Sequence, residues 1–246
     1  MGQFGIGQPV TRLEDPRLLK GQGRYINDTN LPGQAYLVFV RSPHAHAKIQ
    51  SIDISAAAAA AGVIGVYTGE DLVQAGLGLI PITLKRARPD GSPMFAPAHP
   101  GLVRDRVRFV GDPFAMVIAQ TRTQAQDAAE LLAVDFDVLP SVTDTAGSVA
   151  PGAPAVWDAC PDNVSNLFEA GNRAATDAAI ASAAHVIKRR FVITRVFAHY
   201  METRGAVGTW DPGEDRYTLY ADVQYPHRVR SALATRSEER RVGKEC

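Results

Sequence analysis

The chain has 246 residues with 26 basic and 26 acidic side chains, so its formal net charge is zero. This balance, with 46% hydrophobic residues, is typical of a globular protein and argues against attraction to nucleic acid or an anionic membrane. No apolar run has the length of a membrane span, and the first residues lack the regions of a secretory signal. The two cysteines, Cys160 and Cys246, predict neither a disulfide framework nor a zinc site. We therefore expect a cytoplasmic protein with reduced thiols.

Five apolar stretches in the first 140 residues are predicted strands: 33–42, 46–55, 63–69, 106–121 and 134–140. In the second stretch Ile49 and Ile52 depart from strict alternation, which predicts a bulge or partial burial. The fourth is broken by the Gly-Asp-Pro sequence at 111–113, because Pro cannot donate to a central strand ladder. A buried sheet interrupted by bends is therefore expected.

Helices are predicted between these strands at three places: an alanine-rich run capped by Ser55 and ended by Gly62, a turn opening at Glu70–Asp71, and an amphipathic helix over 122–134. Together with its flanking strands, the last of these predicts a strand–helix–strand unit. Residues 76–103 are rich in Pro and Gly and have weak periodicity. They are predicted to make a long excursion over the surface.

The second half of the chain begins with residues 140–162, whose Pro, Gly, Ala and Ser content predicts a domain linker. Beyond it we expect a sequence of elements: a short strand at 166–171, a helix at 174–184, strands at 185–196, 205–211 and 216–224, and a helix at 226–234 opened by Pro226. The Asp-Pro-Gly-Glu-Asp sequence at 211–215 predicts a hairpin turn. Gln224 is expected to end the last strand.

Few side chains suggest chemistry by themselves. The glycine-rich residues 2–8 lack the preceding strand and following apolar helix of a phosphate-binding loop. His44 and His46 could form a metal pair, but no third ligand lies at a sensible spacing, and hydrogen-bonded histidines are favoured. Asp135 and Asp137 fit the solvated face of an edge strand better than an acid–base pair.

The N-terminal residues carry a cluster of opposite charges. Glu14 and Asp15 lie beside Arg12 and Arg17, which predicts a local ion-pair cluster that docks the N-terminal arm. Taken from the residues alone, no set of side chains forms a convincing catalytic centre.

Three longer motifs, however, resemble one family. They are residues 12–55, which include GRYINDTNLPG and RSPHAHA, residues 107–142, which include VRFVGDPFAMVIA, and residues 200–234, which include METRGAV and DVQYPH. They are similar to the molybdenum-binding large subunit of the xanthine dehydrogenase, aldehyde oxidase and aerobic carbon monoxide dehydrogenase family. The resemblance covers about residues 8–235, in order and at plausible spacing.

The resemblance implies an α+β fold with an α/β hammerhead domain followed by the truncated start of a molybdopterin-binding α+β domain. Residues 1–145 are expected to be the N-terminal arm plus the hammerhead, 146–162 the linker, and 163–235 the incomplete molybdopterin-binding domain. Residues 236–246 put seven charges into eleven positions and do not continue the preceding apolar helix face. We expect them to be a non-native tail.

For the intact subunit, the resemblance implies water-derived hydroxylation of an aldehyde or N-heterocycle, or oxidation of carbon monoxide. The expected cofactor is molybdenum-molybdopterin in its cytosine dinucleotide form. The [2Fe-2S] clusters and FAD are expected on partner subunits, an iron–sulfur subunit and an FAD subunit, in a dimer of heterotrimers. The family's general-base glutamate lies beyond residue 235, so the chain alone is expected to be inactive. The alternative is a non-catalytic hammerhead module for subunit assembly.

The resemblance assigns one cofactor-binding residue, Gln224, and no catalytic residue or metal ligand. In the family this Gln contacts the apical oxo ligand of molybdenum, to which an amide can donate without adding charge; otherwise it caps the next helix. Glu202 and Arg204 match the family's Met-Glu-Pro-Arg pattern, with Thr203 in place of Pro. A buried ion pair is the favoured role for them. His227 either lies near the cofactor or has a local partner.

Overall fold

A computed structural model describes residues 7, 11–80, 82, 84–88, 90–194, 196–199 and 202–236. The described residues fall into two compact units. The large unit holds residues 34–190 and the chain from 227 onward, and the small unit holds the chain up to 33 and within 191–226. Apart from Arg236, the expected tail lies outside the described residues.

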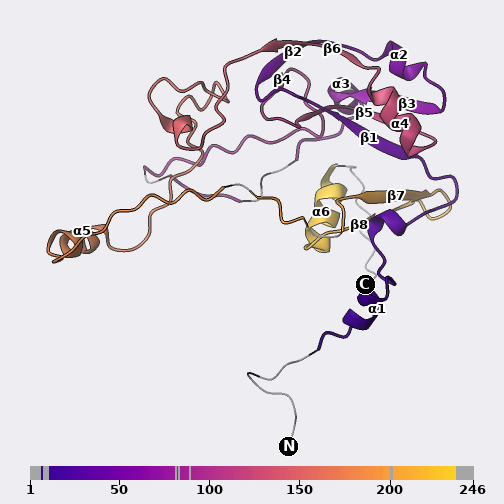
Figure 1. The fold of residues 1–246 in the computed structure, drawn as a ribbon. Coiled ribbons are helices and arrows are strands. Elements are labelled where there is room, and N and C mark those ends of the chain that lie inside the picture. Colours follow the sequence, from indigo (N-terminus) through magenta and orange to yellow (C-terminus); the bar gives the residue numbers. More distant parts are fainter. Residues whose placement is uncertain are drawn as a thin grey trace, which may run out of the picture. The chain divides into compact units, whose positions relative to one another are not determined.

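The large unit contains two three-stranded antiparallel sheets (Figure 1). The first has the order β1-β5-β3, formed by Tyr36–Arg41, Pro113–Ala119 and Val63–Thr68. The second has the order β4-β2-β6, formed by Arg106–Val107, Ala47–Asp53 and Ala133–Val138. Its helical elements are α2 (Ser55–Ala58), α3 (Gly69–Gln74), α4 (Arg122–Ala129), the 3-10 turn η2 (Gly147–Val149), α5 (Arg173–Ala181) and α6 (Pro226–Arg236). This mixture of helices and strands confirms the predicted α+β class.

Strand β5 belongs to both hydrophobic cores of the large unit. Its residues Val117 and Ala119 are fully buried in a cluster that includes Ala125 and Ala128 of α4. Phe114, at the start of the same strand, is 2% exposed and lies edge-on to Phe136 of β6, with ring centroids 5.6 Å apart. The predicted strand–helix–strand unit is therefore confirmed, although its two strands lie in different sheets.

Two predicted irregularities of the strands are confirmed. The β2–β6 register shifts between Ile49 and Ser51, where the sequence predicts a bulge. At the predicted break, Gly111 has φ +93° and Pro113 is the first residue of β5, so the missing proline N–H falls at the strand end.

The predicted cap at Ser55 is wrong. Helix α2 begins at Ser55 itself, and its N-cap position is Ile54. The carboxylate of Asp53 accepts the Ser55 N–H at 2.9 Å, so an aspartate two residues earlier orders this turn. The other predicted helices begin within one residue of the prediction, although the helix predicted over 122–134 ends at Ala129. The Thr121 hydroxyl caps α4 by accepting the Gln124 N–H at 3.2 Å.

Two predicted strands, at 166–171 and 185–196, are wrong for the described residues, which form no strand there (Figure 1). A strand requires a hydrogen-bonded neighbour as well as an apolar pattern. Residues 185–194 are all exposed, including Phe191 at 84% and Ile193 at 94%. The pattern is present, but the described chain supplies no paired strand.

The stretch predicted to be a linker has defined contacts within the large unit. Asp158 pairs with Arg106 at 3.1 Å, and the Arg108 guanidinium lies 3.7 Å from the centroid of the Trp157 ring. The predicted excursion over 76–103 also makes contacts within the large unit, because the Phe95 N–H donates to the Ser165 carbonyl at 2.9 Å. The role of 146–162 as a boundary between domains stays a prediction.

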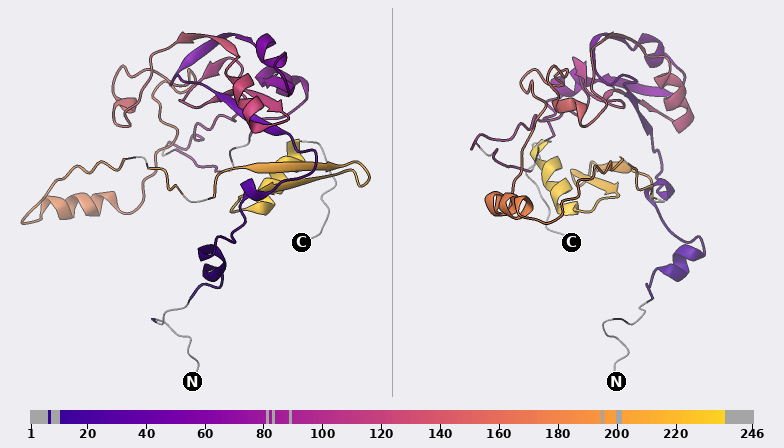
Figure 2. Two further views of the ribbon diagram at one scale, coloured as in Figure 1. Left: turned by 45° about the vertical axis from the view of Figure 1, so that its right-hand side comes forward. Right: turned by 60° about the vertical axis from the view of Figure 1, so that its left-hand side comes forward.

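The small unit contains α1 (Asp15–Leu19), η1 (Ile26–Asp28) and an antiparallel hairpin of β7 (Ala206–Asp211) and β8 (Arg216–Ala221), which Figure 2 shows from two sides. The predicted turn is confirmed, since Asp211 accepts the N–H of Gly213 at 2.8 Å. Of the predicted charge cluster, Arg12 pairs with Asp15 at 2.9 Å. Across both units, no described helix combines the length and apolar character needed to cross a bilayer.

Candidate functional site

The bend between β8 and α6 carries the predicted cofactor residue. Strand β8 ends at Ala221, and Gln224 follows as an exposed residue two positions before α6 begins at Pro226. The prediction that Gln224 ends the strand is wrong by three residues. The ladder starts where Ala206 of β7 pairs with Ala221, so residues 222–224 have no opposite strand residue.

The chain around this bend is tied to the start of β7. The N–H of Gly205 donates to the Asp222 carboxylate at 3.4 Å, and both residues are half-buried. Asp222 lies two residues before Gln224 in the sequence. The contact therefore restrains the backbone directly after β8.

The N-terminal segment packs against the same region of the small unit. The carboxylate of Glu202 accepts the Ile26 N–H at 3.3 Å, and Ile26 is only 8% exposed. A Cβ at Gly205 would lie 2.9 Å from Cγ2 of Ile26, so only glycine fits this approach without a shift. We did not predict this role for Ile26. The available signal is an isolated apolar residue within a polar lead-in.

A hollow of about 450 Å³ lies between this N-terminal segment and β8. Tyr220 of β8 forms one wall, and the other lining residues are Arg24, Tyr25, Asp28, Thr29, Asn30 and Leu31. Asp28 is already engaged, because its carboxylate accepts the Tyr25 N–H at 2.8 Å. The hollow is therefore lined by both polar and apolar groups, and one of them, Asp28, holds the turn η1.

The other predicted site residues are Glu202, Thr203 and Arg204, which match the family's Met-Glu-Pro-Arg pattern, and His227. Thr203 and Arg204 are exposed, whereas Glu202 is half-buried and engaged with Ile26. The expected burial of a Glu202–Arg204 ion pair is wrong, because Arg204 is exposed; the pairing itself stays a prediction. His227 is exposed in the first turn of α6, and its suggested contact with a cofactor or a local partner also stays a prediction.

The hydrogen-bonded role favoured for the two histidines is confirmed for the ring of His46 at Nδ1, although its buried Nε2 has no hydrogen bond. His46 is 6% exposed and its Nδ1 lies 3.0 Å from the carbonyl oxygen of Pro140. His44 lies edge-on to Phe136, with ring centroids 5.1 Å apart. Over the part of the chain that the structure describes, no three His, Cys, Asp or Glu side chains gather as metal ligands.

Three aspartates differ sharply in their surroundings. Asp135 and Asp137 are exposed on β6, as predicted for a solvated face, and Asp137 lies 3.9 Å from Lys48. Asp112 is only 1% exposed; its Oδ2 accepts the Arg108 N–H at 2.9 Å, but its Oδ1 has no hydrogen bond. Burial raises the pKa of the Asp112 carboxyl, and Arg108 and His99 partly offset this. The Gly-Asp-Pro sequence predicted a bend but not this burial.

Cys160 is buried in the large unit, 5% exposed, with its Sγ 3.3 Å from Asp162 Oδ1. Burial raises the pKa of this thiol, and Asp162 acts in the same direction. A thiol held protonated in this way is a packing group and a poor nucleophile.

Two family models match the chain in succession. Residues 20–140 match the aldehyde oxidase and xanthine dehydrogenase a/b hammerhead domain, and residues 156–238 match a molybdopterin cofactor-binding domain. The bend at Gln224, Asp222 and the Glu202–Gly205 stretch all lie within the second match.

Known proteins show the same relationship over most of the chain. It is 38% identical to the nicotine 6-hydroxylase large subunit of Paenarthrobacter nicotinovorans over 93% of this chain and 27% of that protein. It is 33% identical to the carbon monoxide dehydrogenase large chain of Afipia carboxidovorans, covering 94% and 29%. The crystal structure of quinoline 2-oxidoreductase from Pseudomonas putida 86 aligns with a TM-score of 0.78 and 34% identity, covering 95% and 29%.

The chain therefore belongs to the xanthine dehydrogenase, aldehyde oxidase and carbon monoxide dehydrogenase family of molybdopterin-binding large subunits. It corresponds to an N-terminal portion of its relatives and spans less than a third of their length.

Proposed function

We propose that this chain is the N-terminal part of the large subunit of a molybdenum hydroxylase-type oxidoreductase. The intact subunit would hydroxylate an aldehyde or N-heterocycle with oxygen from water, or oxidise carbon monoxide. The observation that carries the proposal is the match of residues 156–238 to a molybdopterin cofactor-binding domain. Relatives named as a nicotine hydroxylase and a carbon monoxide dehydrogenase support the reaction class.

Gln224 is proposed to face the molybdenum cofactor. Its neutral amide lies exposed in a bend and is able to donate a hydrogen bond to an oxygen acceptor. The donor fits an oxygen ligand of the metal, because an amide adds no charge to the site. When bound, the cofactor would supply the two-electron chemistry.

The residues around Gln224 are proposed to set its position. The Gly205–Asp222 hydrogen bond restrains the backbone just before the bend, and the Glu202–Ile26 hydrogen bond holds the N-terminal segment beside the start of β7. We assign no catalytic residue and no metal ligand to this chain. The general base is proposed to lie in the polypeptide beyond residue 235, which would leave the chain alone inactive.

The remaining assignments follow the family. We propose the cytosine dinucleotide form of the pterin, with [2Fe-2S] clusters on an iron–sulfur subunit and FAD on a flavin subunit. A dimer of such heterotrimers in the cytoplasm is the proposed assembly. The relatives include one named as a subunit of a dehydrogenase complex, which supports separate partner chains.

A chimera tests this function directly. The matched portion of the nicotine 6-hydroxylase large subunit is replaced by this chain and expressed with that enzyme's partners. We expect measurable nicotine hydroxylation, and Gln224→Ala should lower it by about 10- to 100-fold, in the range seen for groups that support a metal site. Gln34→Ala, at a position before β1, serves as the control for an amide lost elsewhere.

The chimera can also disprove the proposal. A well-folded chimera that carries stoichiometric molybdenum but gives equal rates with Gln224→Ala and Gln34→Ala would remove Gln224 from the site.

The alternative function, a hammerhead module for subunit assembly, is favoured by one observation. The matched hammerhead region contains both buried cores of the large unit and is well packed in this chain. A chimera that binds the iron–sulfur and flavin chains but incorporates no molybdenum or pterin would support this alternative instead.

A further inference from the structure

The side chains of His99 and Asp112 face each other across a short gap in the large unit. Nε2 of His99 lies 3.8 Å from Oδ1 of Asp112. Asp112 is 1% exposed, and among the described residues this oxygen has no hydrogen bond. Buried polar atoms are nearly always paired, so an unpaired carboxylate oxygen needs an explanation. The His99 side chain is 39% exposed and can exchange protons with solvent.

The other ring nitrogen of His99 determines what Nε2 can offer. Nδ1 lies 2.8 Å from the carbonyl oxygen of Pro100. A carbonyl oxygen can only accept, so Nδ1 carries a hydrogen and, in the neutral imidazole, Nε2 is an acceptor. Two acceptors therefore face each other across the gap to Asp112, and a hydrogen bond forms there only when a proton enters the pair.

The cationic groups around this pair keep their charge. Arg108 donates its backbone N–H to Oδ2 of Asp112, and its guanidinium also acts on this carboxylate. From the end of β1, Arg41 donates to the Gly111 carbonyl at 2.9 Å. Guanidinium groups stay protonated in proteins, so His99 and Asp112 are the members of this group that titrate. Burial raises the pKa of the Asp112 carboxyl, which favours uptake of a proton shared by the pair.

The two residues belong to different segments of the large unit. Asp112 closes the bend before β5, where its N–H donates to the Phe109 carbonyl at 3.1 Å and its carbonyl accepts the Ser42 N–H at 2.9 Å. His99 belongs to the excursion over 76–103, and its backbone forms a bridge with Ile80. A hydrogen bond between the two side chains would therefore tie the excursion to the bend.

We propose that His99 and Asp112 form a pH-sensitive clamp, in which one proton taken up in mildly acidic solution closes the Nε2–Oδ1 hydrogen bond and holds the excursion against the bend. Imidazole is the side chain that ordinarily changes its charge between about pH 5 and pH 8. The clamp is closed on the acidic side of this range, and it opens as the pH rises and the two acceptors are left facing each other. Both residues lie in the matched hammerhead region, so the clamp does not depend on the proposed function.

Hydrogen exchange of the whole chain tests the clamp. The N–H groups of Ile80 and His99 each donate to the other's carbonyl, at 2.6 and 3.3 Å, so their protection reports on the excursion. We compare protection factors, which remove the pH dependence of the exchange chemistry itself. They should be about tenfold higher near pH 6 than near pH 8 at these two amides, the size of one hydrogen bond with a charged partner. The amide of Val117 in β5 should not change.

Asp112→Asn should reverse the response. The amide oxygen can replace Oδ2 and keep the Arg108 N–H, which puts the amide nitrogen in the place of Oδ1 as a donor to neutral Nε2. The contact would then close above neutral pH and open in acid, where two donors face each other. Protection at Ile80 and His99 should therefore be higher near pH 8 than near pH 6, by about fivefold, as for a neutral hydrogen bond.

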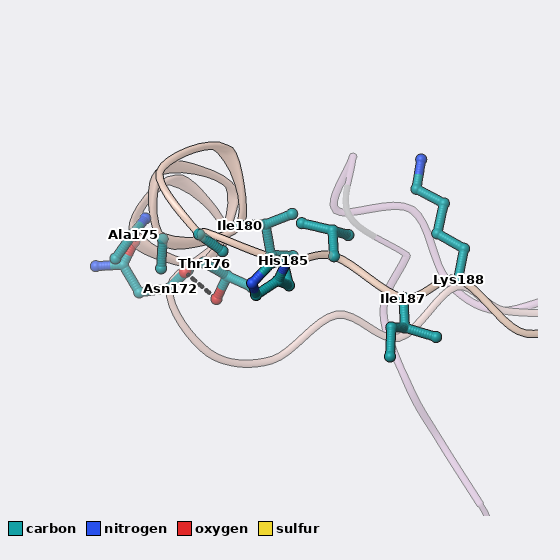
Figure 3. A pocket seen from close by; sticks show the side chains of 10 residues that line it. Asn172, Ala175, Thr176, Ile180, His185, Ile187 and Lys188 are labelled. Atoms are coloured by element: carbon teal, nitrogen blue, oxygen red, sulfur yellow. Dashed lines mark hydrogen bonds between the residues drawn. The ribbon is translucent and has the colours of Figure 1, made fainter.

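His99→Gln should abolish the pH dependence, because an amide does not titrate in this range. His185→Gln is the matched control. Figure 3 shows His185 beside Ile180 along α5, and the described residues that line this hollow of about 770 Å³ include no carboxylate. The control should leave the pH dependence at Ile80 and His99 as it is in the parent chain.

Three results would each disprove the clamp. Protection at Ile80 and His99 could be equal at the two pH values in the parent chain, or the dependence could survive in His99→Gln. It could also keep the parent's sign in a folded Asp112→Asn. Melting curves by circular dichroism check folding, and because His99 is half-buried, His99→Gln decides the question even where Asp112→Asn does not fold.

Discussion

The three-stranded sheet β1-β5-β3 and the two-stranded hairpin β7–β8 are both antiparallel and both rich in apolar side chains, yet only the first buries them. Val117 on β5 is fully buried beneath α4. On the hairpin, Trp210 and Tyr217 face each other with ring centroids 4.2 Å apart, but they remain 44% and 64% exposed. Alternating apolar residues allow two strands to form a hydrogen-bonded ladder, but their side chains are buried only where a second layer packs over the sheet.

The difference bears on where stability lies. A hairpin of two strands is marginal in water, whereas three strands packed against a helix can be independently stable. We therefore expect the large unit to account for most of the cooperative unfolding free energy of this chain.

The largest expected difference in unfolding free energy is between alanine substitutions at two phenylalanines, one buried and one exposed. Phe114→Ala removes a ring that is 2% exposed and packs on Phe136, and it should lower the unfolding free energy of the large unit by about 3–5 kcal/mol. Phe191→Ala changes a side chain that is 84% exposed and should have an effect within about 0.5 kcal/mol. Urea denaturation followed by circular dichroism measures both. Equal losses would show that Phe191 is buried in solution.

A smaller effect should come from the buried carboxylate. Because burial raises the pKa of Asp112, the folded state binds its proton more tightly than the unfolded state. The destabilisation that Asp112 causes is therefore absent at pH values below its ordinary pKa. It grows as the pH rises from the ordinary pKa to the raised pKa of the folded state, and it is complete above the raised pKa. Asp112→Asn keeps an acceptor for the Arg108 N–H and removes the buried charge.

We expect Asp112→Asn to stabilise the large unit by about 1 kcal/mol at neutral pH, because it removes the cost of burying a charge and leaves a neutral group of the same size. The gain should vanish in acid. Thermal melts of both proteins from acid to neutral pH provide the measurement. A variant that is less stable than the parent at neutral pH would show that the attraction of Asp112 to Arg108 and His99 outweighs its burial.

An effect of similar size at one helix, and none at the other, should distinguish two capped helices. Thr121→Ala removes the cap of α4, whose Ala125 and Ala128 are fully buried, and should cost about 1 kcal/mol of unfolding free energy. The Asn172 side chain caps α5 by accepting the Ala175 N–H at 3.0 Å, but α5 buries no residue. Asn172→Ala should lower helix content and leave the main unfolding midpoint unchanged. A shift in that midpoint would mean that α5 is packed in solution.

Much of the fold could be predicted because its signals are local. The bulge in β2 and the Gly111–Pro113 break are backbone preferences of the residues themselves, and the amphipathic spacing of α4 shows its buried face. The Ser55 cap was wrong because a competing local acceptor, Asp53, lay two residues earlier. The strand at 185–196 was wrong because its pattern required a neighbour that the described chain does not provide.

The candidate site was predictable to a lesser degree. Gln224 was assigned by resemblance and stays a prediction as a site residue; its location three residues beyond β8 depends on where β7 begins to pair. The contact of Glu202 with Ile26 joins residues 176 positions apart and left no periodic signal. The burial of Asp112 was hidden in the same way, since a Gly-Asp-Pro bend can lie equally well on a surface.

By itself, the sequence determined the family, the order of most strands and helices, and the turns between them, because short-range backbone preferences and motif spacing encode these features. Only the tertiary structure decided which apolar strands are covered, which acidic groups lose their water and which helix packs. Burial and hydrogen-bond pairing depend on partners distant in the chain. In β5 those partners are present, whereas along α5 and residues 185–190 the apolar surface remains exposed.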